Sequence, residues 1–220
     1  MISRIRKTGF KFFFATLFNR IVPQWLFRMR RYVVYEMDVQ KLQAASQPSL
    51  EASVLEFSAC QTSAEIEAVE TLTWFSRELS TGDLRAFQAT LDGQLAGGVW
   101  IASGVFDEDE LGLRLMLSPQ QAWLFAALVA EQARNKKVYS KLLPFVVAEV
   151  SQEFPRVLLA VNPDNRPSNS VHKKASRQTL GTVVAIRLLQ FSVCWVSGQI
   201  RKDRTCSWQA TKHPIELTLE

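Results

Sequence analysis

Histidine and cysteine are both scarce in this chain of 220 residues, which has two histidines and three cysteines. Cys60, Cys194 and Cys206 are odd in number and contain no Cys-x-x-Cys pair, so they predict neither a disulfide framework nor a zinc site. With only His172 and His213 available, the composition also argues against Cys-His and Ser-His hydrolases. We therefore expect no metal, and we expect reduced thiols in a cytoplasmic protein.

Acidic residues are absent from residues 1–31, although the whole chain carries a net charge of +5. The basic residues of this segment are Arg4, Arg6, Lys7, Lys11, Arg20, Arg28, Arg30 and Arg31. Bulky apolar side chains lie between them, and Arg20 and Pro23 leave no apolar run of about 20 residues for a transmembrane span. A signal peptide would need a longer apolar centre and a small-residue cleavage site. The segment is predicted to be a basic, amphipathic helical arm.

Two interpretations of this arm remain open. It is suited to an anionic membrane surface, with its aromatics in the acyl boundary and its cations on the head groups. Alternatively, its aromatics pack on the globular domain or on a second copy in a homodimer. No nucleic-acid-binding module accompanies the arm, so no nucleic acid is expected as partner. The expected location is cytoplasmic, and peripheral on the inner face of a membrane if the arm binds lipid.

The remaining residues alternate between strand and helix patterns, and their number suits one substantial core. We expect an extra strand and a polar linker over 32–53 and one domain over 54–220. Thr62 or Ser63 caps a helix predicted to run to about Leu79, and Asp92-Gly93 marks a hairpin. Further strands are expected over 122–130, 155–161 and 181–196.

The most informative stretch is a basic turn between an apolar strand and an amphipathic helix. It contains Arg134, Lys136 and Lys137, and apolar residues then recur at helical spacing from Val138. A helix N-terminus offers unpaired N–H groups and the positive end of a dipole. The pattern therefore predicts a phosphate cradle.

The pattern Arg134-x-x-x-Val138-x-x-x-Leu142-Leu143 resembles the pyrophosphate loop of the GNAT acyl-CoA N-acyltransferases. That loop usually contains glycines, where this chain has Lys137 and Tyr139. A lysine is compatible with the loop if its backbone is helical, because only a positive φ demands glycine.

A second segment strengthens the resemblance. Asn165-x-x-Ser168-x-x-Val171-His172-x-Lys174 follows a predicted strand and resembles the family pattern Asn-x-x-Ala/Ser-x-x-Leu-Tyr-x-Lys. His172 stands where the family often has a tyrosine that acts as general acid, and the Gly-Phe that usually ends the pattern is missing.

The resemblance, which covers about residues 54–196, implies an α/β fold. This fold has a central, mostly antiparallel sheet, a splayed parallel strand pair and flanking helices. It also implies transfer of an acyl group, most simply acetyl, from acyl-CoA to the primary amine of a small acceptor. The implied residues for binding acetyl-CoA or another acyl-CoA are Leu128, Val129, Ala130, Arg134, Lys136, Lys137, Val138, Tyr139, Asn165 and Ser168.

Three residues are candidates for proton transfer. Glu131 would act as base for the amine, directly or through water, and His172 or Tyr139 would protonate the leaving thiolate. Each also has a non-catalytic interpretation. Glu131 would be a solvated carboxylate beside Arg134, His172 a helix-face histidine without a role, and Tyr139 a residue that packs against its helix. The acidic run 106–110 is either an attractor for a cationic amine or, more commonly, a solvated loop.

Two other functional classes fit the same residues. The altered turn fits a catalytically inactive relative that binds acyl-CoA as a sensor or membrane-surface scaffold. The arm alone fits a peripheral membrane or oligomerisation protein whose domain is structural. Release of thiol from acyl-CoA would distinguish the enzyme from both.

Overall fold

A computed structural model describes residues 26–46, 55–76 and 82–220. The chain divides into two compact units. We call the first, Met37–Val105 with Leu117–Leu159, the central unit. The second, Met1–Glu36 with Phe106–Met116 and Ala160–Glu220, is the terminal unit.

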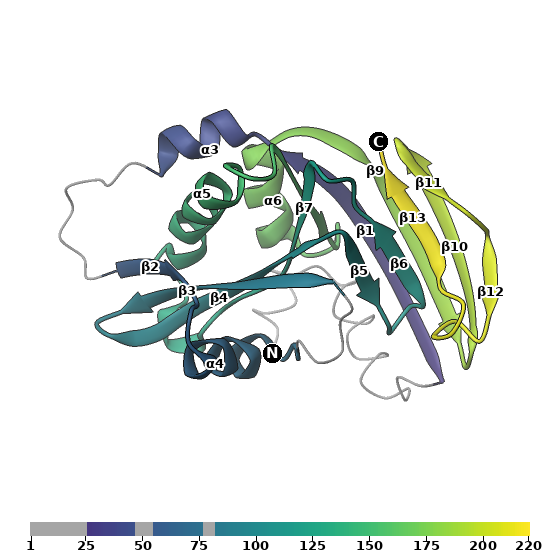
Figure 1. The fold of residues 1–220 in the computed structure, drawn as a ribbon, viewed down its shortest axis with the longest axis horizontal. Coiled ribbons are helices and arrows are strands. Elements are labelled where there is room, and N and C mark those ends of the chain that lie inside the picture. Colours follow the sequence, from purple (N-terminus) through teal and green to yellow (C-terminus); the bar gives the residue numbers. More distant parts are fainter. Residues whose placement is uncertain (1–25, 47–54, 77–81) are drawn as a thin grey trace. The chain divides into compact units, whose positions relative to one another are not determined.

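The central unit contains a mixed sheet in the strand order β2-β3-β4-β7-β8 (Figure 1). Its strands are β2 (Leu55–Ala59), β3 (Asp83–Leu91), β4 (Gln94–Ser103), β7 (Gln121–Val129) and β8 (Arg156–Val161), whose last two residues belong to the terminal unit. Each neighbouring pair is antiparallel except β7 and β8, which are parallel. The predicted α/β class with one parallel strand pair is therefore confirmed.

Helices cover both faces of this sheet. They are α4 (Ser63–Thr73) and α5 (Val138–Val150), and α3 (Val39–Ala45) packs against α5. Successive residues of a strand point to opposite faces. A Cβ on Gly97 would lie 3.1 Å from Val138 of α5, and one on Gly98 would lie 2.8 Å from Val69 of α4. These two glycines of β4 therefore let α5 and α4 approach the sheet closely from opposite sides.

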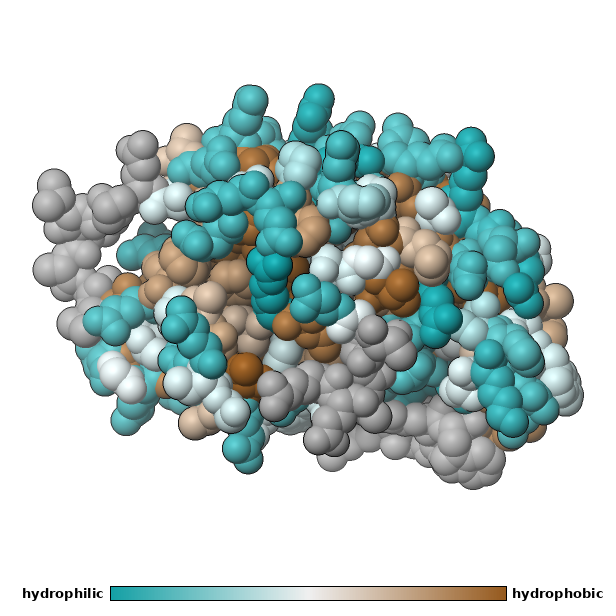
Figure 2. Space-filling view, in the orientation of Figure 1, coloured by the Kyte–Doolittle hydropathy of each residue, from teal (hydrophilic) through white to brown (hydrophobic). Residues whose placement is uncertain are grey.

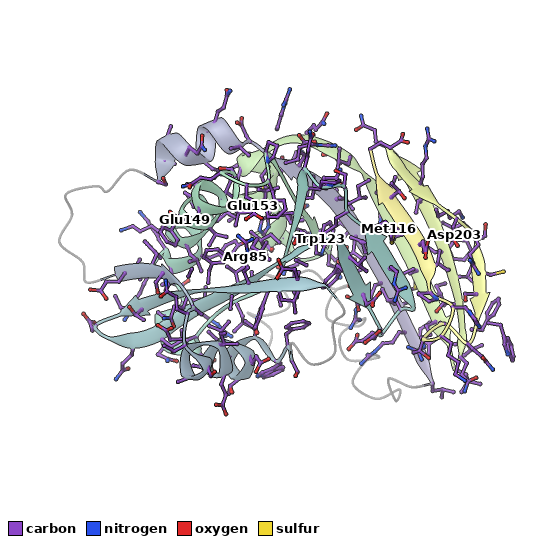
Figure 3. The ribbon with its side chains drawn as sticks, viewed as in Figure 1. Arg85, Met116, Trp123, Glu149, Glu153 and Asp203 are labelled. Carbon is purple, nitrogen blue, oxygen red and sulfur yellow. The ribbon has the colours of Figure 1, made fainter. Side chains whose placement is uncertain are left out.

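Helix α5 is held to the sheet by its apolar face and by its C-terminal end. Leu142, Val146 and Val147 are fully buried. Past the end of the helix, the Glu153 carboxylate lies 2.6 Å from the Arg85 guanidinium of β3, as Figure 3 shows. The same guanidinium stacks on the Phe154 ring. Figure 2 shows apolar side chains in the region where α5 lies over β3.

The terminal unit contains two groups of strands and one helix. The strands β1 (Phe27–Met37), β9 (Ser176–Leu188), β10 (Phe191–Gly198) and β12 (Cys206–Trp208) follow the order β12-β10-β9-β1. A four-stranded sheet has the order β11-β13-β6-β5, from β11 (Ile200–Lys202), β13 (Ile215–Leu219), β6 (Leu113–Met116) and β5 (Val105–Glu108). The helix is α6 (Arg166–Ala175), and it runs directly into β9.

The predicted helical arm is wrong over residues 27–31, because these residues begin β1. Arg28 is buried and Met29 is exposed, so burial alternates with the period of a strand. Residues 1–25 lie outside the described part of the chain. No helix in that described part is long and apolar enough to cross a membrane.

Two other boundaries differ from expectation. The first half of the predicted linker forms α3, because the Asp38 carboxylate accepts from the Lys41 amide at 3.1 Å and caps a run of good helix formers. Helix α4 ends at Thr73 rather than near Leu79, because Trp74 adopts a left-handed backbone with φ of 56°.

Candidate functional site

The site begins at the point where β7 leaves β8. Parallel pairing between the two strands extends from Gln121 with Arg156 to Leu124 with Leu159. Beyond it, β7 continues to Val129 and pairs with β4 on its other side. Leu128 and Val129, two predicted ligand-binding residues, lie in this continuation. Within the described residues, the pairing of β7 with β8 ends at Leu124, which agrees with the predicted splayed strand pair.

A bulge shapes this part of β7. The register between β4 and β7 shifts between Gly98 and Trp100, and Ala126 on β7 has a φ of 46°. A left-handed alanine in a strand is unfavourable, and a bulge is the usual setting that imposes one. The bulge redirects the N–H and C=O groups of the residues that follow, including the exposed Ala127.

The basic turn follows at once. The Ala130 amide donates to the Ala96 carbonyl at 2.9 Å and ties the end of β7 to β4. A short 3-10 helix, η2 (Glu131–Ala133), comes next, and then two left-handed residues, Asn135 with φ of 69° and Lys137 with φ of 58°. Alternation of left-handed and other conformations turns successive N–H groups toward one concave side, which favours anions.

Lys137 does not meet the condition of a helical backbone that would make a lysine compatible with the loop. Its φ of 58° and ψ of 20° lie in the left-handed region, where glycine is favoured. The turn thus keeps a backbone shape that suits glycine while it carries a lysine side chain. The closure between β7 and α5 imposes this shape and overrides the preference of the residue.

The N-terminus of α5 has no side-chain cap. The Ser140 hydroxyl donates to the Lys137 carbonyl at 2.8 Å, and it does not cap the helix. The first turn contains no acidic residue. The initial N–H groups of a helix have no intrahelical acceptor, and they carry the positive end of the dipole. Val138, the first residue of α5, is buried. An uncapped helix N-terminus of this kind is a type of position that favours an anion.

Side-chain charge reinforces the cradle. Arg134, Lys136 and Lys137 are all exposed. The Arg134 guanidinium lies 3.5 Å from the Glu131 carboxylate, and both side chains are largely in solvent. Such an exposed pair is weak, so a phosphate can take Arg134 from Glu131 at little energetic cost.

Tyr139 is half-buried in the first turn of α5. Desolvation raises the pKa of its phenol well above the usual value of 10. The phenol is therefore protonated at neutral pH, which is the state that a proton donor needs.

Helix α6 holds the second predicted group of residues, in the terminal unit. Its N-cap is Asn165, whose side-chain oxygen accepts from the Ser168 amide at 3.5 Å. Pro167 follows in the first turn, as is common at helix starts. The amide at Ser168 is therefore satisfied within the helix. The predicted site residues thus form two groups, one in each unit.

His172 is buried, and its Nδ1 lies 2.8 Å from the Ser168 carbonyl. A carbonyl only accepts, so Nδ1 carries the proton and the neutral ring has an unprotonated Nε2. Desolvation lowers the pKa of His172, although the bond to Ser168 opposes this shift. A neutral histidine of this tautomer is poorly suited to be the general acid predicted from the sequence.

One residue near this group escaped the sequence analysis. The Tyr35 hydroxyl of β1 donates to the Asn169 side chain of α6 at 2.6 Å, and burial raises the pKa of Tyr35. The two positions are 134 residues apart, and no local pattern links them. Tyr35 fixes the orientation of α6 within the terminal unit.

The acidic run 106–110 is not simply a solvated loop. The Arg114 guanidinium bonds the Asp107 carboxylate at 2.7 Å, and Arg187 donates to the Asp109 carbonyl. Burial raises the pKa of Glu108 to about 7. These contacts lie inside the terminal unit, so we do not assign this run to the acceptor.

The aromatics considered for the acceptor differ in their exposure. Trp100 is buried and its indole donates to Thr73 at 3.0 Å. Phe75 packs edge-on against Trp100 and Phe125. Trp74 is 91% exposed. Trp100 and Phe75 are therefore core residues, and Trp74 alone faces solvent.

Metal ligands do not gather in the described residues, where no three His, Cys, Asp or Glu side chains form a cluster that could hold an ion.

Comparison with solved structures identifies GNAT proteins among those of similar fold. A GCN5-related N-acetyltransferase from Kribbella flavida is 9% identical, with a TM-score of 0.48 over 72% of this chain and 57% of that one. A putative GNAT acetyltransferase from Novosphingobium aromaticivorans is 15% identical, with a TM-score of 0.49 over 72% and 63%. A Drosophila protein, 14% identical, has a TM-score of 0.50 over 81% and 56%.

This chain spans about three-fifths of the length of these structures. No protein-family model and no curated protein matches the sequence. Identities of this size concern the fold alone. The similarity is therefore one of fold, to structures that include proteins described as GNAT acetyltransferases.

Proposed function

We propose that this protein is an acyl-CoA-dependent N-acyltransferase that moves an acyl group, most simply acetyl, to the primary amine of a small acceptor. The observation that carries the proposal is the uncapped N-terminus of α5 behind a basic, left-handed turn. This cradle follows directly on a strand edge that has left its neighbour. The turn would hold the pyrophosphate of coenzyme A, and the edge would pair with its pantetheine amides.

The chemistry follows from this placement. The acceptor nitrogen forms a bond to the thioester carbonyl carbon, and the resulting oxyanion collapses as the C–S bond breaks. A backbone N–H at the edge of β7 would stabilise the oxyanion, since a fixed donor needs no reorganisation during the reaction. The products are an amide and the free thiol of coenzyme A.

Two protons must move in this reaction. The attacking amine loses one, and Glu131, exposed at the end of β7, is the candidate base. The departing thiolate gains one. We assign this role to Tyr139 rather than His172, because the Tyr139 phenol is protonated at neutral pH while the His172 ring is neutral with its proton on Nδ1.

Calorimetry with acetyl-CoA tests the cradle. A Lys136→Ala, Lys137→Gly variant removes two charges and keeps the left-handed backbone accessible, so we expect its affinity to fall about tenfold or more. The matched control, Arg204→Ala with Lys212→Ala, removes two exposed charges of the terminal unit and should leave the affinity unchanged. Equal affinity of both variants and the wild type would refute the cradle.

Thiol release then tests turnover. Acetyl-CoA is incubated with a panel of small primary amines, and free thiol is measured with a colorimetric reagent. Amine-dependent release that Tyr139→Phe reduces at unchanged acetyl-CoA affinity supports the enzyme and the role of Tyr139. Tight binding without release from any amine would instead identify an acyl-CoA-binding protein without turnover.

A further inference from the structure

The terminal unit exposes an unusual number of large apolar side chains. Within the described residues, seven large hydrophobic side chains are exposed, and five of them lie on β1, β9, β10, β12 or the turn between β9 and β10. They are Met29, Leu188, Leu189, Trp195 and Trp208. Single exposed apolar residues are ordinary, whereas a contiguous group marks an interaction surface.

Strand register shows that the group is contiguous. On β10, burial alternates, with Ser192 and Cys194 buried. The intervening residues align with residues of β9 and β12 in three rows across the outward side of the sheet. The first row contains Leu188, Phe191 and Trp208, the second contains Ile186, Val193 and Cys206, and the third contains Val184 and Trp195. We call this side the outer face.

Strand β1 extends the outer face. Arg28 and Arg30 both reach the Glu110 carboxylate, at 3.7 and 3.3 Å. Ser192 of β10 donates to the neighbouring Leu111 carbonyl at 2.6 Å, so these three side chains share the opposite, inner side. Residues 29 and 31 alternate with them and therefore belong to the outer face.

The charge of the outer face favours an anionic partner. The outward positions named on β1, β9, β10 and β12 include Arg31 and no acidic residue. The sequence that leads into β1 adds five Lys and Arg and no acid over residues 1–25. Leu26, the first described residue before β1, lies at the rim of the face, because the Leu189 amide donates to the Leu26 carbonyl at 2.8 Å.

We propose that the outer face of the terminal unit is a docking surface for an anionic phospholipid bilayer. Tryptophan suits the membrane interface, where its ring is buried and its N–H stays near water. Trp195, 48% exposed, and Trp208, 70% exposed, supply this anchor, and Leu188 and Met29 add apolar area. The adjacent cations are attracted to the negative head groups. The proposal does not depend on the activity assigned above.

Vesicle sedimentation of the full chain tests the surface. The wild type should pellet with phosphatidylcholine vesicles that contain phosphatidylglycerol, and much less with phosphatidylcholine alone. Trp195→Thr with Trp208→Thr should weaken binding about tenfold or more, because both anchors are lost while the strand propensity is kept. Trp74→Asn removes a more exposed tryptophan from the central unit and should change nothing. Thermal melting confirms that each variant is folded.

Quenching by brominated lipid checks the same contact without disturbing the face. With Trp74 replaced, tryptophan emission should still fall on addition of brominated anionic vesicles. Three results would overturn the proposal. The first is that the wild type does not bind anionic vesicles. The second is that the double variant binds as well as the wild type, while deletion of residues 1–25 abolishes binding. The third is that the wild type is a dimer and the double variant a monomer, which would make the face a contact between copies.

Discussion

Helices α5 and α6 begin in opposite ways. At α6, the Asn165 side chain caps the helix and accepts from the Ser168 amide. At α5, Lys137 occupies the N-cap position in a left-handed conformation, and no side chain caps the helix. Both starts carry a motif that resembles the GNAT acyltransferases, but of the two helices only α5 lacks a side-chain cap. A cap stabilises a helix, and its omission is expected where a ligand is to take its place.

The largest expected effect is a loss of stability when the buried face of the uncapped helix α5 is disrupted. Helix α5 depends on its buried face, so Leu142→Ala should lower the free energy of unfolding by about 2–5 kcal/mol. Lys141→Ala, at the neighbouring position of α5, should change it by less than about 0.5 kcal/mol. Urea denaturation measures both. A loss below about 1 kcal/mol for Leu142→Ala would mean that packing does not hold α5.

Removal of the side chain at each helix start should lower stability more in α4 and α6 than in α5. Thr62 accepts from the Glu65 amide at the start of α4, and Thr62→Ala should cost about 1 kcal/mol. Asn165→Ala should cost a similar amount or slightly less, because its bond of 3.5 Å is long. Ser140→Ala in α5 should cost less than about 0.5 kcal/mol, since Ser140 caps no amide. Equal losses at all three positions would contradict the contrast.

Relief of backbone strain at Lys137 should raise the free energy of unfolding, whereas the preceding substitutions lower it. Lys137→Gly removes a left-handed lysine, and the gain, offset by the greater entropy of glycine in the unfolded chain, should be a few tenths to about 1 kcal/mol. Lys137→Val, with a branched side chain in the same conformation, should destabilise the protein. Thermal melting ranks the three proteins. Loss of stability in Lys137→Gly would show that the lysine side chain makes contacts that outweigh its strain.

The smallest expected effect is a dependence of stability on pH. It arises from Glu65 in the first turn of α4, whereas the first turn of α5 contains no acidic residue. Hydrogen bonds from the Thr62 and Gln61 amides and the Thr62 hydroxyl lower the pKa of Glu65 from 4.5. The folded pKa lies below the unfolded one, so the contribution of Glu65 is complete above pH 4.5 and is lost as the pH falls through the folded value. The stability difference between wild type and Glu65→Gln should therefore shrink toward about pH 3. A constant difference would contradict it.

Local patterns predicted the parts of the fold that are fixed locally. The Asp92-Gly93 hairpin has two positive φ angles, as its sequence requires, and Thr62 with Glu65 forms a capping box. The basic turn between β7 and α5 also lies where its composition indicated. For the hairpin and the capping box, neighbouring residues determine the geometry, whereas for the turn they indicated only its position.

The remainder depends on contacts between distant residues. Nothing in the sequence around His172 indicates that it is buried, and the Tyr35–Asn169 bond spans 134 residues. The left-handed backbone of Lys137 is imposed by chain closure against the preference of a lysine. The start of α3 could have been predicted locally, because Asp38 is a good N-cap residue. It was missed because the residues just before it have a strand pattern.

The adjacent glycines of β4 also determine how this chain can vary during evolution. Beneath Val138 and beside Val69 there is no room for a methyl group at either glycine without displacement of a neighbour. A side chain at position 98 requires Val69 to move, and one at position 97 requires a smaller adjustment of Val138, whereas position 137 already carries a lysine in an exposed turn. A lineage can thus alter the charge of its phosphate turn many times while the two glycines that let its helices approach the sheet remain unchanged.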